Sequence, residues 1–150
     1  MFRKSLAGVV GLALGLTLAV AGLAEAAGYV PGGDICGVWQ AQSRGARVKI
    51  APCNDGVCGT VLYATPAKSN PLLLDVNNKD PALRGRRMVG ATLITGFTGG
   101  PVKWTGGRLY NPGDGNYYHG SLTLLDEDHL KVKGCALIIL CKSQTWTRVD

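Results

Sequence analysis

Two segments at opposite ends of the chain constrain its fold most strongly. Residues 36–41 carry a Gly-x-Trp tripeptide that ends at Trp39, and residues 144–149 carry Arg148. A large ring on the first strand and a guanidinium on the last suit the closed end of a small antiparallel barrel. The ring fills the bottom of such a barrel, and the guanidinium can stack on the indole face. We therefore predict that Trp39 and Arg148 close one barrel, with the rest of its wall between them.

Polar and apolar residues alternate along the segments between these two ends. In residues 117–125, for example, Tyr118, Gly120, Leu122 and Leu124 fall on one face. A period of two is typical of a half-buried strand. After residue 27, only a single turn at residues 80–83 shows a helical signal. The eight predicted strands cover residues 36–41, 47–50, 57–63, 88–97, 102–110, 117–125, 130–134 and 144–149.

The fold class that follows is all-β, an eight-stranded antiparallel barrel with up-and-down order. Such a barrel is just wide enough for its own side chains or one small ligand. Up-and-down order places the start of the first strand and the end of the last at one end, with Trp39 and Arg148. It places the long connection 65–87, the turn 111–115 and the last connection at the opposite, open end. A long ordered loop in a small domain is usually functional or a lid.

Residues 1–26 have the features of a secretory signal peptide, which leaves residues 27–150 as a single barrel domain. Arg3 and Lys4 precede an apolar run, and Ala24-Glu25-Ala26 fits a small-x-small cleavage site. An uncleaved membrane anchor is the alternative, because the run is long enough to span a bilayer. We expect export, to the periplasm or outside the cell.

The net charge of +6 is spread along the chain rather than gathered in one run. The cluster at residues 84–87 is the exception, and no nucleic-acid-binding motif accompanies it. We therefore expect no nucleic-acid partner. A moderately basic exported protein can instead approach anionic polymers or the membrane surface of the cell envelope.

Five cysteines lie after the signal segment. Cys53 and Cys58 flank an Asp-Gly turn, which predicts a disulfide across a hairpin at the closed end. Cys135 and Cys141 fall together at the open end and form the second predicted pair. Cys36 is then free or paired between molecules, although a Cys36–Cys53 bridge would satisfy the same geometry. The cysteine and histidine spacing does not match a zinc site.

No motif for catalysis accompanies the barrel pattern. The sequence contains no Gly-x-Ser-x-Gly, His-Glu-x-x-His or phosphate-binding loop and no evident nucleophile–base pair. Asp75, Asn77, Asn78 and Asp80 offer oxygens, but their spacing does not match a calcium loop, and Asx turns explain them. We predict that the protein is not an enzyme and has no catalytic residue, no cofactor and no metal.

A set of short motifs along residues 37–148 resembles a known family. The sequence is similar to an uncharacterised family of exported bacterial proteins, domain of unknown function 2147, and more broadly to the calycin pattern of lipocalins and fatty-acid-binding proteins. The resemblance implies a lipocalin-like barrel and export, but no defined activity. Its motifs are Gly37-x-Trp39, Cys53 with Cys58-Gly59, Asp75-x-x-Asn78, Leu83-Arg84-Gly85-Arg86, Gly90, Trp104-x-Gly106-Gly107, Tyr110-x-Pro112, Gly115 with Tyr118, Gly134-Cys135, and residues 144–148.

The apolar stretch 136–140 directs the functional hypothesis. Five apolar residues between Cys135 and Cys141 are costly to leave in water. We expect them to form one lip of the open mouth, with Arg84 and Arg86 opposite, around the apolar tail and anionic head of an amphipathic molecule. The predicted ligand-binding residues are Arg84, Arg86, Trp104, Tyr110, Tyr118, Leu137 and Ile139.

Alternatives exist for each part of this hypothesis. Residues 136–140 could extend the flanking strands and belong to the core, or be covered by a partner, a membrane or the long loop. Arg84 and Arg86 could bind backbone carbonyls of their own loop. If the barrel is filled solid, the protein is an envelope interaction or structural module without a ligand.

Overall fold

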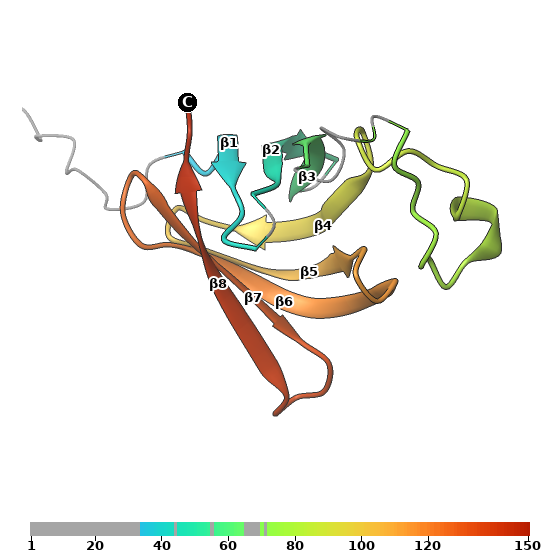
Figure 1. Cartoon of the computed structure of the whole chain (residues 1–150). Helices are drawn as coiled ribbons and strands as arrows, with labels where there is room; N and C mark the ends of the chain where they lie inside the picture. The colour runs from blue at the N-terminus through green and yellow to red at the C-terminus, as the bar shows by residue number, and fades with distance from the viewer. Residues whose placement is uncertain (1–33, 44, 55, 65–69, 71) are drawn as a thin grey trace, which may run out of the picture.

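The computed structural model describes residues 34–43, 45–54, 56–64, 70 and 72–150, and the predicted signal segment 1–26 lies outside them (Figure 1). Eight antiparallel strands form a closed barrel in sequence order, which confirms the predicted fold class. The strands are β1 Gly37–Gln40, β2 Arg47–Cys53, β3 Gly56–Tyr63, β4 Thr92–Gly99, β5 Lys103–Asn111, β6 Asn116–Leu124, β7 His129–Cys135 and β8 Cys141–Arg148.

The barrel closes through a short seam between its first and last strands. β1 pairs with β8 only at Trp39↔Arg148 and Gln40↔Thr147, whereas β7 pairs with β8 along seven residue pairs. Because β1 is so short, the far half of β8 has no backbone partner on that side. On its other side β7 pairs with β6 as far as Cys135, so the loop beyond Cys135 projects from the barrel wall (Figure 1).

Trp39 and Arg148 lie together at the closed end. Trp39 is fully buried, and its indole N–H donates to the Ile35 carbonyl at 2.9 Å. The Arg148 guanidinium lies 4.2 Å from the centroid of the Trp39 ring and donates to the carbonyls of Cys36 and Asp34, each at 2.8 Å. A cation over an indole face, with its N–H groups satisfied by carbonyls, seals this end of the barrel.

Large side chains form the core of the barrel, and glycines in the wall make room for them. Phe97 and Ile94 have no exposed surface. A Cβ added to Gly107 would lie 2.2 Å from the Phe97 ring, and one added to Gly59 would lie 2.9 Å from Ile94. The other fully buried wall residues are Trp39, Val48, Ile50, Leu122 and Leu130.

Two strands start three or more residues away from the positions predicted from the sequence. β4 begins at Thr92 rather than at Met88, because Ala91 N–H bonds back to the Met88 carbonyl and Gly90 takes a φ of +90°. β8 begins at Cys141 rather than at Gln144. Tertiary pairing with β7 extends β8, so the hairpin reaches Cys135 and Cys141.

The disulfides join Cys53 to Cys58 and Cys135 to Cys141, which are the predicted pairs. Cys36 is free, so the alternative Cys36–Cys53 bridge is not formed. Partial burial raises the pKa of the Cys36 thiol to about 11, and the nearby Asp34 carboxylate acts in the same direction. Cys36 therefore stays a protonated thiol at neutral pH.

Helix is almost absent from the described chain. A single 3₁₀ turn, η1 Pro81–Leu83, is capped by Asp80, whose carboxylate accepts from Ala82 N–H at 2.9 Å. None of the helical structure in the described part of the chain is long and apolar enough to cross a membrane.

Candidate functional site

The long segment between β3 and β4 is anchored through a buried carboxylate. Asp75 and Asn78 are each only 1% exposed, although both are polar. The Asp75 carboxylate accepts hydrogen bonds from the Tyr110 hydroxyl at 2.5 Å, from Asn78 Nδ2 at 2.7 Å and from Arg86 Nε at 2.9 Å. Three donors on two oxygens leave this carboxylate engaged within the protein.

Tyr110 meets this segment on the outer face of the barrel wall. Its ring packs against the exposed Tyr117 ring with centroids 4.8 Å apart, while the neighbouring Leu109 packs against the core. The Arg86 guanidinium carbon lies 5.0 Å from the Tyr110 ring centroid. Burial raises the pKa of the Tyr110 hydroxyl to about 12, and its hydrogen bond to Asp75 acts in the same direction.

The side chains of Arg86 and Arg84 both contact groups of the long segment itself. Arg86 forms an ion pair with Asp75, with Nη2 2.8 Å from Oδ2, although this nitrogen is not aligned for a hydrogen bond and has no other partner. Arg84 Nε donates to the Asn78 carbonyl at 2.8 Å. These contacts correspond to the alternative that we derived from the sequence, in which the arginines bind groups of their own loop.

The same segment also contacts the β5–β6 turn. Asn77 Nδ2 donates to the Pro112 carbonyl at 3.1 Å. Gly115 approaches so closely that an added Cβ would lie 1.8 Å from the Asn77 carbonyl oxygen. Four of the motifs that carried the family resemblance thus meet in one place and hold the long segment on the barrel: Asp75-x-x-Asn78, Arg84-Gly85-Arg86, Tyr110-x-Pro112 and Gly115.

The second candidate region is the β7–β8 loop, residues 136–140, which we call the tip loop. Its four large side chains are exposed: Leu137 by 65%, Ile138 by 97%, Ile139 by 85% and Leu140 by 59%. The alternative that these residues belong to the core is therefore wrong. The loop is closed by the hydrogen bond from Ala136 N–H to the Leu140 carbonyl at 2.9 Å.

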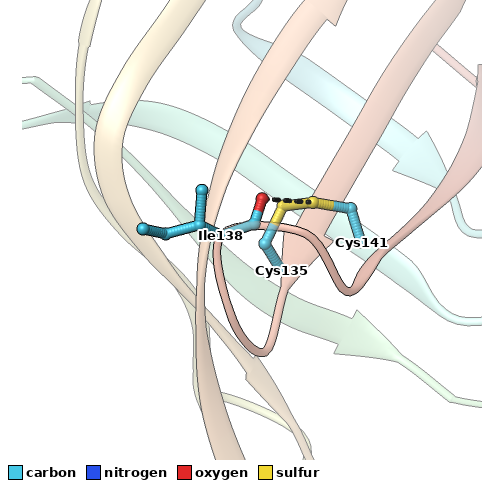
Figure 2. Close-up of a disulfide and its surroundings, with 3 residues drawn as sticks. All are labelled: Cys135, Ile138 and Cys141. Atoms are coloured by element: carbon cyan, nitrogen blue, oxygen red, sulfur yellow. Dashed lines mark hydrogen bonds between the residues drawn. A yellow bond between two sulfur atoms is a disulfide. The ribbon is translucent and has the colours of Figure 1, made fainter.

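The Cys135–Cys141 disulfide ties the base of the tip loop. Figure 2 shows the Ile138 side chain directed away from the two sulfurs. The Ile138 carbonyl oxygen lies 3.8 Å from Cys141 Sγ. Because this sulfur is in a disulfide it has no proton to donate, and we treat the approach as a packing contact. The disulfide and the backbone hydrogen bond hold the aliphatic side chains outward.

The seven predicted ligand-binding residues do not form one pocket. Trp104 is buried toward the closed end, next to Gly100. Tyr118 lies at the open end, where its hydroxyl donates to Asp114 at 2.5 Å. Arg84, Arg86 and Tyr110 belong to the anchor of the long segment, and Figure 1 shows this segment well separated from the tip loop that carries Leu137 and Ile139.

A bulge in β5 explains why Tyr110 is on the outside. Strict alternation from Trp104 would point Tyr110 inward, but the register shifts between Thr105 and Arg108, where Gly106 and Gly107 of β5 lie opposite the single residue Gly120 of β6. Gly106 takes a φ of +80° within this bulge. The Gly106-Gly107 pair was the sequence signal for it, since glycine inside a strand pattern marks bulges. The role of Asp75 as the partner of Tyr110 had no such local signal.

The geometry defines the class of protein: a small, closed antiparallel barrel with a docked outer loop and an exposed apolar tip. Residues 37–148 match the model of a family described as "Uncharacterized protein conserved in bacteria (DUF2147)", and the chain belongs to this family. No curated protein matches the sequence.

A solved structure shows the same fold. It is the protein HP1028 from the human pathogen Helicobacter pylori, which is described as belonging to the lipocalin family. The two proteins are 20% identical, the alignment covers 78% of this chain and 84% of that one, and the TM-score is 0.70. At this identity the similarity shows the lipocalin-like fold alone.

Proposed function

We propose that this protein is an exported barrel that binds amphipathic molecules, and that their apolar part binds at the tip loop. The observation that carries the proposal is the exposure of four consecutive aliphatic side chains, from 59% to 97%. Full burial of one such side chain is worth about 1.5–3 kcal/mol. An exposed apolar cluster of this kind marks a binding surface rather than ordinary surface variation.

The tip loop is preorganised for binding. Its base is tied by the Cys135–Cys141 disulfide, and Leu140 N–H bonds back to the Leu137 carbonyl at 3.3 Å. A loop already held in its bound shape loses less conformational freedom when a ligand covers it. The paired cysteines and the predicted signal segment also support export, because disulfides persist in oxidising compartments.

The packing of the barrel determines where we place the ligand. The wall residues Phe97, Ile94 and Leu122 are fully buried and belong to one hydrophobic core cluster. We therefore place the amphipathic molecule at the rim and not deep inside. The same packing favours a second candidate function, an envelope interaction module whose solid barrel binds a protein and no small molecule.

We also infer a binding role rather than a catalytic one. The buried carboxylate of Asp75 accepts hydrogen bonds from Tyr110, Asn78 and Arg86. The contact between His129 and Asp126, at 2.8 Å, lies on an exposed turn at the other end of the hairpin. In the part of the chain that the structure describes, no group of three or more metal-ligating side chains was found.

The test is calorimetric titration with a long-chain carboxylate below its critical micelle concentration. Wild type should bind, and Ile138→Ser combined with Ile139→Ser should weaken binding at least about ten-fold, since two side chains lose their apolar contacts. Leu125→Ser is the matched control, because Leu125 is 52% exposed on the β6–β7 turn, away from the tip loop.

Equal binding by wild type and the double variant would place the ligand elsewhere. No binding by wild type would leave the interaction module as the function.

A further inference from the structure

We propose that the tip loop inserts into the surface of an anionic lipid bilayer, so that the amphipathic partner is the membrane itself. This inference rests on the proposed function and names its partner. Aliphatic side chains at a loop tip, with cations on the strands behind them, match the layered chemistry of a bilayer surface. There the acyl chains lie below a negatively charged headgroup region.

Cations lie directly behind the apolar side chains. Lys133 is on β7 and Lys142 on β8, within two residues of Cys135 and Cys141 respectively, and both are exposed. Arg108 of β5 pairs with His119 of β6, and His119 pairs with Cys135 of β7. Arg108 therefore lies level with the disulfide across the sheet. Each exposed Lys or Arg near an anionic membrane surface adds attraction to its headgroups.

Acidic residues are absent from the whole hairpin that carries the tip loop. Residues 129–149 contain no Asp or Glu, and the acidic turn 126–128 lies at the opposite end of β7. The neighbouring β5–β6 turn carries one carboxylate, Asp114, which accepts hydrogen bonds from Tyr118 and Asn111 and keeps its negative charge. The formal charges on the hairpin itself are all positive, which favours an anionic surface.

The shape of the hairpin allows the tip loop to reach a flat surface. β8 pairs with β1 only at Thr147 and Arg148, and β7 pairs with β6 as far as Cys135, so the tip loop projects beyond the barrel wall (Figure 1). Figure 2 shows Ile138 directed outward from the disulfide. Interfacial insertion needs apolar groups to enter only about 5–10 Å. A rigid loop whose most exposed residues are Ile138 and Ile139 meets this requirement.

A second copy of the chain fits this surface less well. Packing two tip loops against each other would bring Lys133 and Lys142 of both copies together. No carboxylate on either hairpin would be available to pair with them. Like charges brought close in this way oppose association.

The experiment is flotation of the disulfide-bonded protein with vesicles, compared at low and high salt. One set of vesicles contains phosphatidylglycerol and phosphatidylcholine, and the other contains phosphatidylcholine alone. The variants are Ile138→Ser with Ile139→Ser, and Lys133→Gln with Lys142→Gln. The matched controls are Leu125→Ser for the apolar change and Lys131→Gln for the charge change, since Lys131 lies further from the tip loop on β7.

Wild type should float with the anionic vesicles and bind the neutral ones more weakly. The isoleucine variant should lose at least about ten-fold in vesicle affinity. The lysine variant should lose about five-fold or more, with a smaller salt dependence. Ile138→Trp should show a blue-shifted emission and quenching by acyl-brominated lipid.

Three results would overturn the inference. If wild type binds the monomeric carboxylate but no vesicles, the membrane is not the partner and the proposed function survives. If the isoleucine variant floats as well as wild type, attraction is purely electrostatic and the tip loop does not insert. If sedimentation shows a dimer that the isoleucine variant abolishes, and wild type does not float, the tip loop is an interface between copies.

Discussion

The two loop regions outside the barrel wall reverse the ordinary distribution of side chains. In the long β3–β4 segment the polar residues Asp75 and Asn78 are 1% exposed, whereas in the tip loop Ile138 is 97% exposed. The buried side chains of Asp75 and Asn78 have hydrogen-bond partners within the protein. The aliphatic groups of the second have none. The buried polar groups of the first region are thus satisfied within the protein, whereas the large aliphatic side chains of the tip loop remain exposed.

The physical origin of the difference is the surroundings of each loop. A buried carboxylate is tolerated only where donors replace its lost water, and Tyr110, Asn78 and Arg86 do so for Asp75. The tip loop is beyond the reach of β1, which is only four residues long. No neighbouring element of the described structure covers it there. Four sets of substitutions test this difference between the two regions.

Asp75→Asn should have the largest effect, because it leaves Arg86 beside a buried amide that cannot neutralise it. Breaking a buried ion pair by removing one partner costs about 3–5 kcal/mol, and we expect about 3 because Arg86 is partly exposed. Urea unfolding measures this loss in the free energy of unfolding. Asp80→Asn is the control, since asparagine also caps a helical turn and should change stability by less than about 0.5 kcal/mol. A loss below about 1 kcal/mol would contradict the anchor.

Removal of the tip disulfide, by Cys135→Ser with Cys141→Ser, should have the next largest effect on stability. A disulfide that closes a loop of this length stabilises the fold by about 2 kcal/mol, because it lowers the entropy of the unfolded chain. Carboxylate binding should also weaken, because the tip loop would have to be ordered on binding. Cys36→Ser, at the free cysteine, should leave carboxylate binding unchanged. Unchanged binding in the double variant would show that preorganisation is not needed.

Tyr110→Phe should destabilise the fold by about 1–3 kcal/mol, because it removes one donor from the buried Asp75 carboxylate. Tyr117→Phe is the matched control: it lies directly opposite on β6 and is 41% exposed. Its hydroxyl loss should be worth less than about 0.5 kcal/mol. If the two substitutions destabilised the fold equally, the Tyr110 hydroxyl would not contribute to anchoring the long segment.

The pH dependence of the same residue gives a second readout. The pKa of Tyr110 is raised from 10.0 to about 12 in the folded protein, so the folded state holds this proton more tightly than the unfolded state. The stabilisation is fully present below pH 10 and is lost as the pH rises toward about 12. The stability difference between wild type and Tyr110→Phe should shrink across this window, while tyrosinate absorbance reports the late titration.

Ile138→Ser with Ile139→Ser should have the smallest effect on stability, within about 0.5 kcal/mol, because both side chains are already in water in the folded protein. The same variant is expected to lose carboxylate and vesicle binding. A large loss of stability, measured by urea unfolding, would show that the tip loop packs against the protein in solution, and the contrast between the two regions would fail.

Much of the fold could be predicted from the sequence because its signals are local. Alternation of polar and apolar residues predicted the strands, and the Gly-x-Trp start with Arg148 at the end predicted the closed end. The hairpin at Cys53 and Cys58 predicted one disulfide, and up-and-down order placed Cys135 near Cys141. Strand boundaries depend on tertiary contacts as well: β4 begins four residues later than predicted because residues 88–91 form a turn.

The candidate site depended on contacts that no local pattern contains. The sequence determined that residues 136–140 are an apolar loop, because apolar composition and flanking cysteines are visible in the chain itself. Only the tertiary structure decided that Arg84 and Arg86 are bound within their own loop and that Tyr110 faces outward. A single bulge at Gly106 reverses the side of the wall on which later β5 residues lie. Tyr110, one of the partners of Asp75, is 35 residues away from it in the chain. Such a distant pair is brought together only when the whole barrel closes.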